Sequence, residues 1–265
     1  MQVDAVAHWG QKLGCDPREY EDAYSVGASG DTDVWTLSDT SRRLRVAVSD
    51  GATESMLSGR WAGVLAKQYT ASSRAQMRTS IRRAQDRWPR VLHDYKAARE
   101  HADKPIAWYE EPGLDRGAHA TLLVAEFRAR AESEPGMWTA EAVGDSCLFQ
   151  VAGDALVCAF PFTEAAQFDT SPALVQTGQR NRRLLDKHCR RAAGSYRDGD
   201  TFFLCTDALA AWFLAQAERK AEPWRIWRGF SAAAGAAAFR EWTAVERSAG
   251  RLKNDDVTLL TVSMA

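Results

Sequence analysis

Four strand-like segments follow one another between residues 119 and 162, and only short turn sequences separate them. They are HATLLVAEFRA (119–129), GMWTAEAVG (136–144), SCLFQVAG (146–153) and ALVCAFPF (155–162). Parallel strands need a crossover of a dozen or more residues, so connections this short predict antiparallel hairpins. Further strand-like runs lie at 44–51, 201–207 and 256–264. The pattern therefore favours antiparallel sheets over alternating β-α-β units.

Helical periodicity fills the intervals between the two groups of strands. Residues 56–101 contain apolar positions at helical spacing and predict two long helices, with Pro89 at a start or kink. Two more helices are expected at 208–218 and at about 229–248. Strands in two groups with helix pairs between them predict an α/β (α+β) fold, with antiparallel sheets inside and helices layered outside.

Composition excludes several classes of protein. The 265 residues carry 34 Lys plus Arg against 35 Asp plus Glu, a net charge of −1, which argues against a dedicated nucleic-acid binder. The longest uncharged stretch, 229–239, is too short to span a membrane, and the N-terminus lacks an apolar signal segment. The five cysteines form no C-x-x-C pair, which is typical of reduced thiols in a cytoplasmic protein.

Isolated acidic residues mark the ends of several predicted strands. Asp50 and Asp207 end strands, Asp145 lies in a hairpin turn, and Asp255 opens the last strand, while Glu21 and Asp22 precede AYSV (23–26). Carboxylates gathered at one sheet edge repel each other and require a counter-charge, which Mg²⁺ or Mn²⁺ can supply. For any single position, an ordinary turn residue is the simpler interpretation.

The order of these segments resembles the metal-dependent protein phosphatases (PPM, or type 2C serine/threonine phosphatases). REYEDAYSV (18–26), VAVSDGATES (46–55) and GAHATLLVA (117–125) are similar to the family's N-E-D-A, V-x-D-G and G-T-T/S-A motifs. AEAVGDSCLFQV (140–151), GDTFFLCTDAL (199–209) and NDDVTLLTV (254–262) are similar to its later motifs, in the expected order. The resemblance covers nearly the whole chain. It implies a four-layer α-β-β-α sandwich with two central antiparallel sheets, formed by a single domain over 1–265.

The resemblance also implies a role for each acidic residue. Asp50 would bridge two Mn²⁺ or Mg²⁺ ions, Asp207 and Asp255 would hold the first, and the Gly51 carbonyl with Glu21 and Asp22 would serve the second. Asp145 matches a residue that in many members helps to hold a third, weaker ion. Arg18 is the candidate phosphate-binding residue. A hydroxide bridging the two metals would attack phosphorus in line, so no protein nucleophile is needed.

The sequence departs from the family pattern at several positions. In the family the D-G motif usually continues with glycines, as D-G-x-G-G, whereas here it continues with Ala52, Thr53, Glu54 and Ser55. Thr53, Glu54 and Ser55 are candidates either for lining the site or for an N-cap with Glu54 at the start of a helix. Ala208 replaces a glycine, and Asp256 replaces an asparagine, which adds negative charge near the first metal. Arg18 lies one position closer to Glu21 than the pattern expects. No metal carboxylate is lost.

A basic segment, 179–197, lies in the region (about 163–198) where the family carries a variable flap beside the active site. Either it forms a basic rim that attracts acidic or phosphorylated proteins, or it is a solvated amphipathic helix.

The most complete hypothesis is a cytoplasmic phosphomonoester hydrolase acting on phosphoserine or phosphothreonine of proteins, and so counteracting a serine/threonine kinase. No nucleic-acid or membrane partner is expected. The alternatives are a catalytically weak binding or regulatory module and a phosphatase of small molecules.

Overall fold

The computed structural model describes residues 2–27, 33–37, 43–72, 76–129, 134–168, 171–178, 181–230 and 235–265. The elements follow the chain as β1 (Val3–Gly10), η1 (Pro17–Glu19), β2 (Ala23–Val26), β3 (Val34–Leu37), β4 (Arg43–Ser49), α1 (Ser58–Thr70), α2 (Met77–His101), α3 (Glu111–Arg116), β5 (His119–Ala120), β6 (Leu122–Arg128), β7 (Gly136–Val143), β8 (Cys147–Ala152), β9 (Ala155–Phe160), η2 (Ala165–Gln167), β10 (Val175–Gln176), α4 (Asn181–His188), β11 (Arg190–Tyr196), β12 (Thr201–Cys205), α5 (Asp207–Glu218), α6 (Pro223–Arg228), α7 (Gly235–Ser248) and β13 (Val257–Met264).

Two large sheets form the centre of the molecule. One has six strands in the order β3-β1-β13-β12-β8-β9, and the other has five in the order β11-β7-β6-β4-β2. A small third sheet pairs β10 with β5. Each described pairing within these sheets is antiparallel, as the short turns predict.

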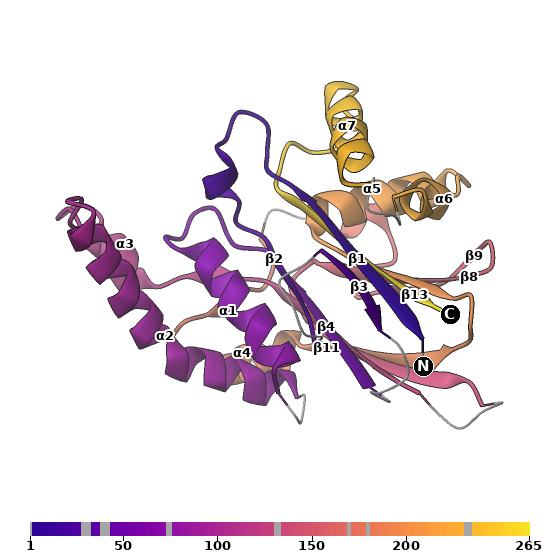
Figure 1. Cartoon of the computed structure of the whole chain (residues 1–265), viewed down its shortest axis with the longest axis horizontal. Helices are drawn as coiled ribbons and strands as arrows, with labels where there is room; N and C mark the ends of the chain where they lie inside the picture. Colours follow the sequence, from indigo (N-terminus) through magenta and orange to yellow (C-terminus); the bar gives the residue numbers. More distant parts are fainter. Residues whose placement is uncertain are drawn as a thin grey trace.

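The two sheets face each other, and helices cover their outer sides (Figure 1). β12 shows how one strand serves two cores. Phe202 and Leu204 join the core between the sheets, whereas Phe203 and Cys205 pack under α5, α6 and α7. Alternate side chains of a strand point to opposite faces, so a strand with helices on one side and a sheet on the other is apolar throughout.

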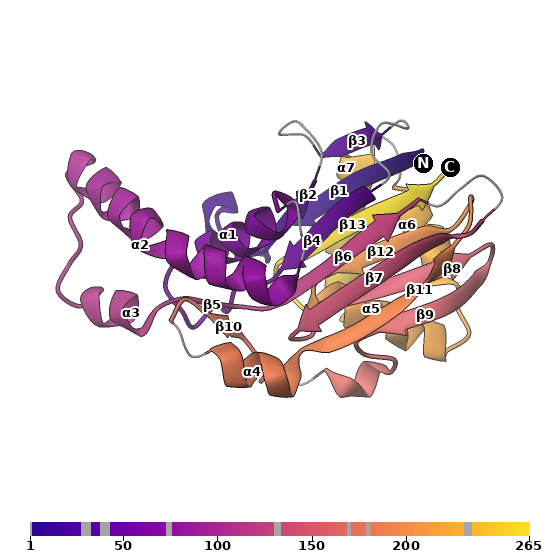
Figure 2. The same cartoon turned by 90° about the horizontal axis from the view of Figure 1, so that it is seen from below.

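The other outer core lies between the five-stranded sheet and the helices α1 and α2. Trp61 and Leu65 of α1 and Ile81 and Trp88 of α2 pack there with Val124 of β6. Pro89 lies inside α2 and does not end it. Three cores between four layers confirm the predicted α-β-β-α sandwich. In Figure 2, the far end of α2 and the short α3 extend beyond the sheets.

Four of the described strands, β1, β3, β10 and β11, were not expected from the sequence. β1 pairs with β13 along its whole length and with β3 on its other side, so the N-terminal segment is an interior strand of the six-stranded sheet. β11 lies in the basic segment and forms an edge of the five-stranded sheet, paired with β7. An edge strand tolerates exposed charges such as Arg190 and Arg191, and its charged sequence therefore hides its β structure.

The rest of the basic segment follows the helical interpretation. Residues 181–188 form α4, with Leu185 buried, while residues 179–180 lie outside the described part of the chain. No helix within the described ranges is long and apolar enough to cross a membrane.

Candidate active site

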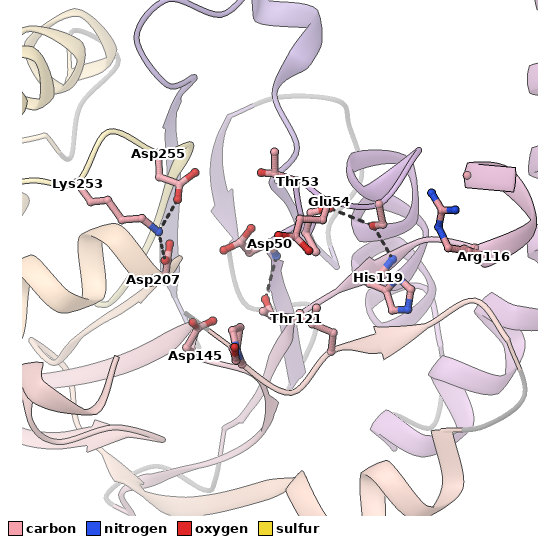
Figure 3. A pocket seen from close by; sticks show the side chains of 18 residues that line it. Asp50, Thr53, Glu54, Arg116, His119, Thr121, Asp145, Asp207, Lys253 and Asp255 are labelled. Atoms are coloured by element: carbon pink, nitrogen blue, oxygen red, sulfur yellow. Dashed lines mark hydrogen bonds and ion pairs between the residues drawn. The ribbon is translucent and has the colours of Figure 1, made fainter. Parts of the chain in front are cut away.

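A cavity of about 750 Å³ opens where the ends of strands from both large sheets meet. Four of the predicted acidic residues line it: Asp50 after β4, Asp145 in the β7–β8 turn, Asp207 after β12, and Asp255 before β13 (Figure 3). The described residues that line it are Asp50, Gly51, Ala52, Thr53, Glu54, Ser55, Gly113, Arg116, Gly117, His119, Thr121, Asp145, Ser171, Pro172, Leu174, Asp207, Lys253 and Asp255. Residues far apart in the sequence thus meet at one edge of the sandwich.

Asp50 is positioned through its backbone by Thr121, the residue between β5 and β6. The Asp50 N–H donates to Thr121 Oγ1 (3.0 Å), and the Thr121 N–H donates to the Asp50 carbonyl oxygen (2.8 Å). Ser49 Oγ donates to the Thr121 carbonyl oxygen at 2.5 Å. These bonds fix the backbone of Asp50 and leave its carboxylate facing the cavity (Figure 3).

Gly51 lies where three backbone segments approach each other. A Cβ at this position would lie 2.6 Å from the Glu21 carbonyl oxygen, 2.7 Å from the Ser58 carbonyl carbon and 2.9 Å from the Gly59 nitrogen. Ordinary carbon contacts are about 3.5–4.0 Å. Glycine is therefore required here by packing, and it brings the Asp50 loop against Glu21 and the start of α1.

Asp207 and Asp255 share a cationic partner. Lys253 Nζ lies 2.7 Å from Asp255 Oδ2 and 3.2 Å from Asp207 Oδ2. The Asp207 and Asp255 side chains are 18% and 28% exposed, whereas that of Lys253 is 64% exposed. The ammonium thus joins the start of α5 to the loop before β13.

Glu21 and Asp22 lie beside the cavity rather than among the described residues that line it. Glu21 accepts a hydrogen bond from Ser58 Oγ, and Lys12 Nζ lies 3.6 Å from it. Asp22 is buried, and its Oδ2 accepts from Thr206 Oγ1 (3.0 Å) and Thr258 Oγ1 (2.9 Å). Its Oδ1 is buried and has no hydrogen-bond partner among the described residues.

Arg18 is not brought to the cavity. It lies in η1 with its side chain 92% exposed, and its Nε is 3.0 Å from Asp16 Oδ1. Asp16 also caps η1, so this pair belongs to the local turn. The described lining of the cavity instead contains Arg116, at the end of α3.

Asp256, which replaces the family's asparagine, makes two backbone contacts. Its Oδ1 accepts the Lys12 N–H (2.8 Å), and its Oδ2 accepts the Glu21 N–H (2.7 Å). Both oxygens are thus directed to the β1–β2 connection, and Asp256 does not belong to the described lining of the cavity.

The gathered carboxylates perturb one another. Burial raises the pKa of Asp50 well above its usual range, and the charges of Asp22, Asp207, Asp145 and Asp255 raise it further. Burial likewise raises the pKa of Asp22. Since burial and like charge both disfavour ionisation, a divalent cation among these oxygens would stabilise the charged forms.

The side chains fit a hard cation in chemistry. Carboxylate oxygens predominate, and Asp22 Oδ1 is a buried acceptor without a partner among the described residues. No three His, Cys, Asp or Glu side chains in the described part of the chain are already gathered closely enough to hold one ion. In this arrangement Lys253 provides the counter-charge for two of the carboxylates.

Several lining residues were missed or left open by sequence reasoning. Lys253 and Arg116 line the cavity but belong to none of the motifs, and Lys253 lies two residues before Asp255. His119, the first residue of a predicted strand, also lines the cavity, and burial lowers the pKa of its imidazole. Thr53, Glu54 and Ser55 line the cavity too, and α1 begins later, at Ser58, with Leu57 at its N-cap.

Comparison with known proteins identifies the fold. The chain has the fold of the metal-dependent, PPM-type phosphatases. The catalytic domain of the serine/threonine phosphatase PstP in complex with two manganese ions has a TM-score of 0.55 and 13% identity, with 100% of each chain covered. PstP/Ppp of Mycobacterium tuberculosis, at 1.95 Å, also has a TM-score of 0.55, with 12% identity and coverage of 100% of this chain and 99% of that one.

Two further solved structures show the same likeness. RsbX in complex with magnesium has a TM-score of 0.53 and 13% identity, covering 100% of this chain and 96% of that chain. PppA, described as a key regulatory component of the type VI secretion system (T6SS) in Pseudomonas aeruginosa, has a TM-score of 0.55 and 15% identity, covering 100% and 99%. No protein-family model and no curated protein sequence matches the chain.

Proposed function

We propose that this protein is a metal-dependent phosphomonoester hydrolase that acts on phosphoserine or phosphothreonine of proteins, opposing a serine/threonine kinase. The observation that carries the proposal is the meeting of Asp50, Asp145, Asp207 and Asp255 in one cavity of about 750 Å³, on a phosphatase fold. With divalent cations bound to its carboxylates, an open cavity of this kind suits a phosphorylated side chain on a peptide.

The proposed ligand set follows from these positions. Asp50 would hold both of two Mn²⁺ or Mg²⁺ ions, with Asp207 and Asp255 on the first. The Gly51 carbonyl would serve the second, together with Glu21 and Asp22 directly or through water. Asp145 would serve a third, weaker ion. When bound, such ions activate a water for attack on phosphorus and neutralise the phosphoryl oxygens.

Arg116 is the proposed anchor for the anionic substrate. The Arg and Lys side chains among the described lining residues are Arg116 and Lys253, and Lys253 is already held by two carboxylates. No ion pair of Arg116 is found within the described part of the chain. A guanidinium binds phosphate or carboxylate in a bidentate manner, so Arg116 can meet a phosphopeptide at the cavity wall. Arg18 could do so only after its pair with Asp16 breaks.

The described basic residues of segment 181–197 do not line the cavity, whereas Ser171, Pro172 and Leu174 do. We therefore assign the flap's contact with substrate to the stretch before β10.

A single domain over 1–265 and action in the cytoplasm remain part of the proposal, the latter because all five cysteines are free.

One observation favours a second candidate, a catalytically weak binding or regulatory module. The ion pairs of Lys253 hold Asp207 and Asp255 without any metal. A protein in which this arrangement persists would act as a binding or regulatory module and would not hydrolyse phosphate esters.

Hydrolysis of an aryl phosphate with and without Mn²⁺ tests the proposal. We expect activity that is lost with EDTA and in Asp50→Asn, but retained in Asp154→Asn, a control in the distant β8–β9 turn. No activity from folded, Mn²⁺-loaded protein on the aryl phosphate and on a phosphopeptide panel would favour the regulatory module. A faster rate on phosphorylated metabolites than on phosphopeptides would indicate a small-molecule phosphatase instead.

A further inference from the structure

Lys253 occupies an unusual place for a lysine. Its ammonium bridges two carboxylates that come from different parts of the chain, Asp207 at the start of α5 and Asp255 before β13 (Figure 3). These are the two residues that the proposed function assigns to the first metal in addition to Asp50. The lysine and that metal would therefore compete for the same ligands.

The competition extends to individual oxygens. Asp207 Oδ1 accepts the Ala208 N–H at 2.6 Å, and Asp255 Oδ1 accepts the Asp256 N–H at 3.0 Å. The Oδ2 atoms face the ammonium, at 3.2 and 2.7 Å. Each carboxylate thus has one oxygen engaged by backbone and its other oxygen held by Lys253.

We propose that Lys253 is a built-in competitor for the first metal, holding Asp207 and Asp255 together in the metal-free protein and leaving when a divalent cation binds. This inference rests on the proposed function. Lys253 acts as a positioning residue, because it touches the metal's ligands and not the substrate.

Two physical effects act in the same direction. A metal must take the Oδ2 atoms from the ammonium, and it must also enter a site whose field the ammonium makes less negative. The Lys253 side chain is 64% exposed, so it can move into solvent. Exposed pairs are weak and screened by salt, and two pairs plus the field effect therefore suggest about a five- to tenfold loss of metal affinity.

The test is a Mn²⁺ titration by isothermal calorimetry on the full chain. In Lys253→Met, we expect Mn²⁺ to bind about five- to tenfold more tightly at one site, equal to about 1.0–1.4 kcal/mol. The difference should shrink in 1 M salt, where the Debye length is about 3 Å. In EDTA, Lys253→Met should also lower the thermal midpoint, because Asp207 and Asp255 then lose their counter-charge.

Two matched variants complete the design. Lys253→Arg keeps the charge and should bind Mn²⁺ like the wild type. Lys104→Met removes one positive charge from the α2–α3 loop, outside the described lining of the cavity, and should change nothing. Equal or weaker Mn²⁺ binding by Lys253→Met would overturn this inference alone, whereas no Mn²⁺ binding by any variant would overturn the proposed function with it.

Discussion

Replacing Gly51 by alanine should destabilise the protein, because the added methyl group has no room between three backbone segments. The added Cβ would lie 2.6, 2.7 and 2.9 Å from backbone atoms of Glu21, Ser58 and Gly59. Each distance is roughly 0.6–1.4 Å shorter than an ordinary contact of about 3.5–4.0 Å. Because all three neighbours are backbone atoms, no side-chain rotation can relieve the overlap. Overpacking typically costs about 1–3 kcal/mol, and three backbone contacts place this case near 3 kcal/mol.

The assay is urea unfolding followed by tryptophan fluorescence, in EDTA, so that metal binding does not contribute to the free energy of unfolding. For a chain of this size, about 3 kcal/mol corresponds to a fall of roughly 6–12 °C in the thermal midpoint. The same substitution should weaken Mn²⁺ binding, since the Asp50 loop can no longer lie against Glu21.

Gly63 offers a matched control. It lies within α1, and a Cβ there would meet nothing within 4 Å. Gly63→Ala should therefore stabilise the protein by about 0.5–1 kcal/mol, through the helix preference of alanine. Overpacking should lower the free energy of unfolding by more than about 1 kcal/mol. If the free energy of unfolding of Gly51→Ala lies within about 0.5 kcal/mol of the wild-type value, Gly51 is not required by packing.

Three further predictions concern single side chains. Arg116→Ala should raise the KM for a phosphopeptide about tenfold or more, as expected for loss of a bidentate ion pair, whereas Arg18→Ala should leave the KM within about twofold. If steady-state kinetics show the larger rise in KM for Arg18→Ala, Arg18 and not Arg116 contacts the substrate. Asp256→Asn should lower the free energy of unfolding by about 1–3 kcal/mol, because one of two backbone N–H groups loses its acceptor; unchanged urea midpoints would contradict this. Burial lowers the pKa of His8 in the folded protein. Between about pH 7.5 and 5.5 the His8 imidazole therefore becomes protonated more readily in the unfolded chain than in the folded chain, and the free energy of unfolding falls as the pH falls. His8→Gln should show a smaller fall in thermal midpoint over that range, and an equal fall would exclude His8 as a source.

The layered fold could be predicted because its information is local. Short turns between strands require antiparallel pairing, and runs such as 201–205 are apolar on both faces because sheet and helices cover them. β11 could not be predicted, because its position at a sheet edge removes the apolar pattern. β1 was overlooked although its burial resembles that of the other central strands.

The site could be predicted only in part, for a different reason. The acidic residues follow strand ends and match a motif order, and Asp50, Asp145, Asp207 and Asp255 do line one cavity. The roles of Lys253 and Arg116 depend on which carboxylates and loops surround them in the folded protein. Residue spacing in the sequence does not reveal these neighbours. Arg18 is the opposite case. It matches a motif position in the sequence, but in the structure it pairs with its neighbour Asp16 and does not line the cavity.

The proposed function requires that Asp50 lies between two divalent cations. Anomalous diffraction at the manganese absorption edge, from crystals soaked in Mn²⁺, tests it most directly. We predict two strong peaks flanking the Asp50 carboxylate, one of them beside Asp207 and Asp255, with the Lys253 ammonium displaced from both. A map with no peak beside Asp50, and with Lys253 still bridging Asp207 and Asp255, would refute the two-metal site.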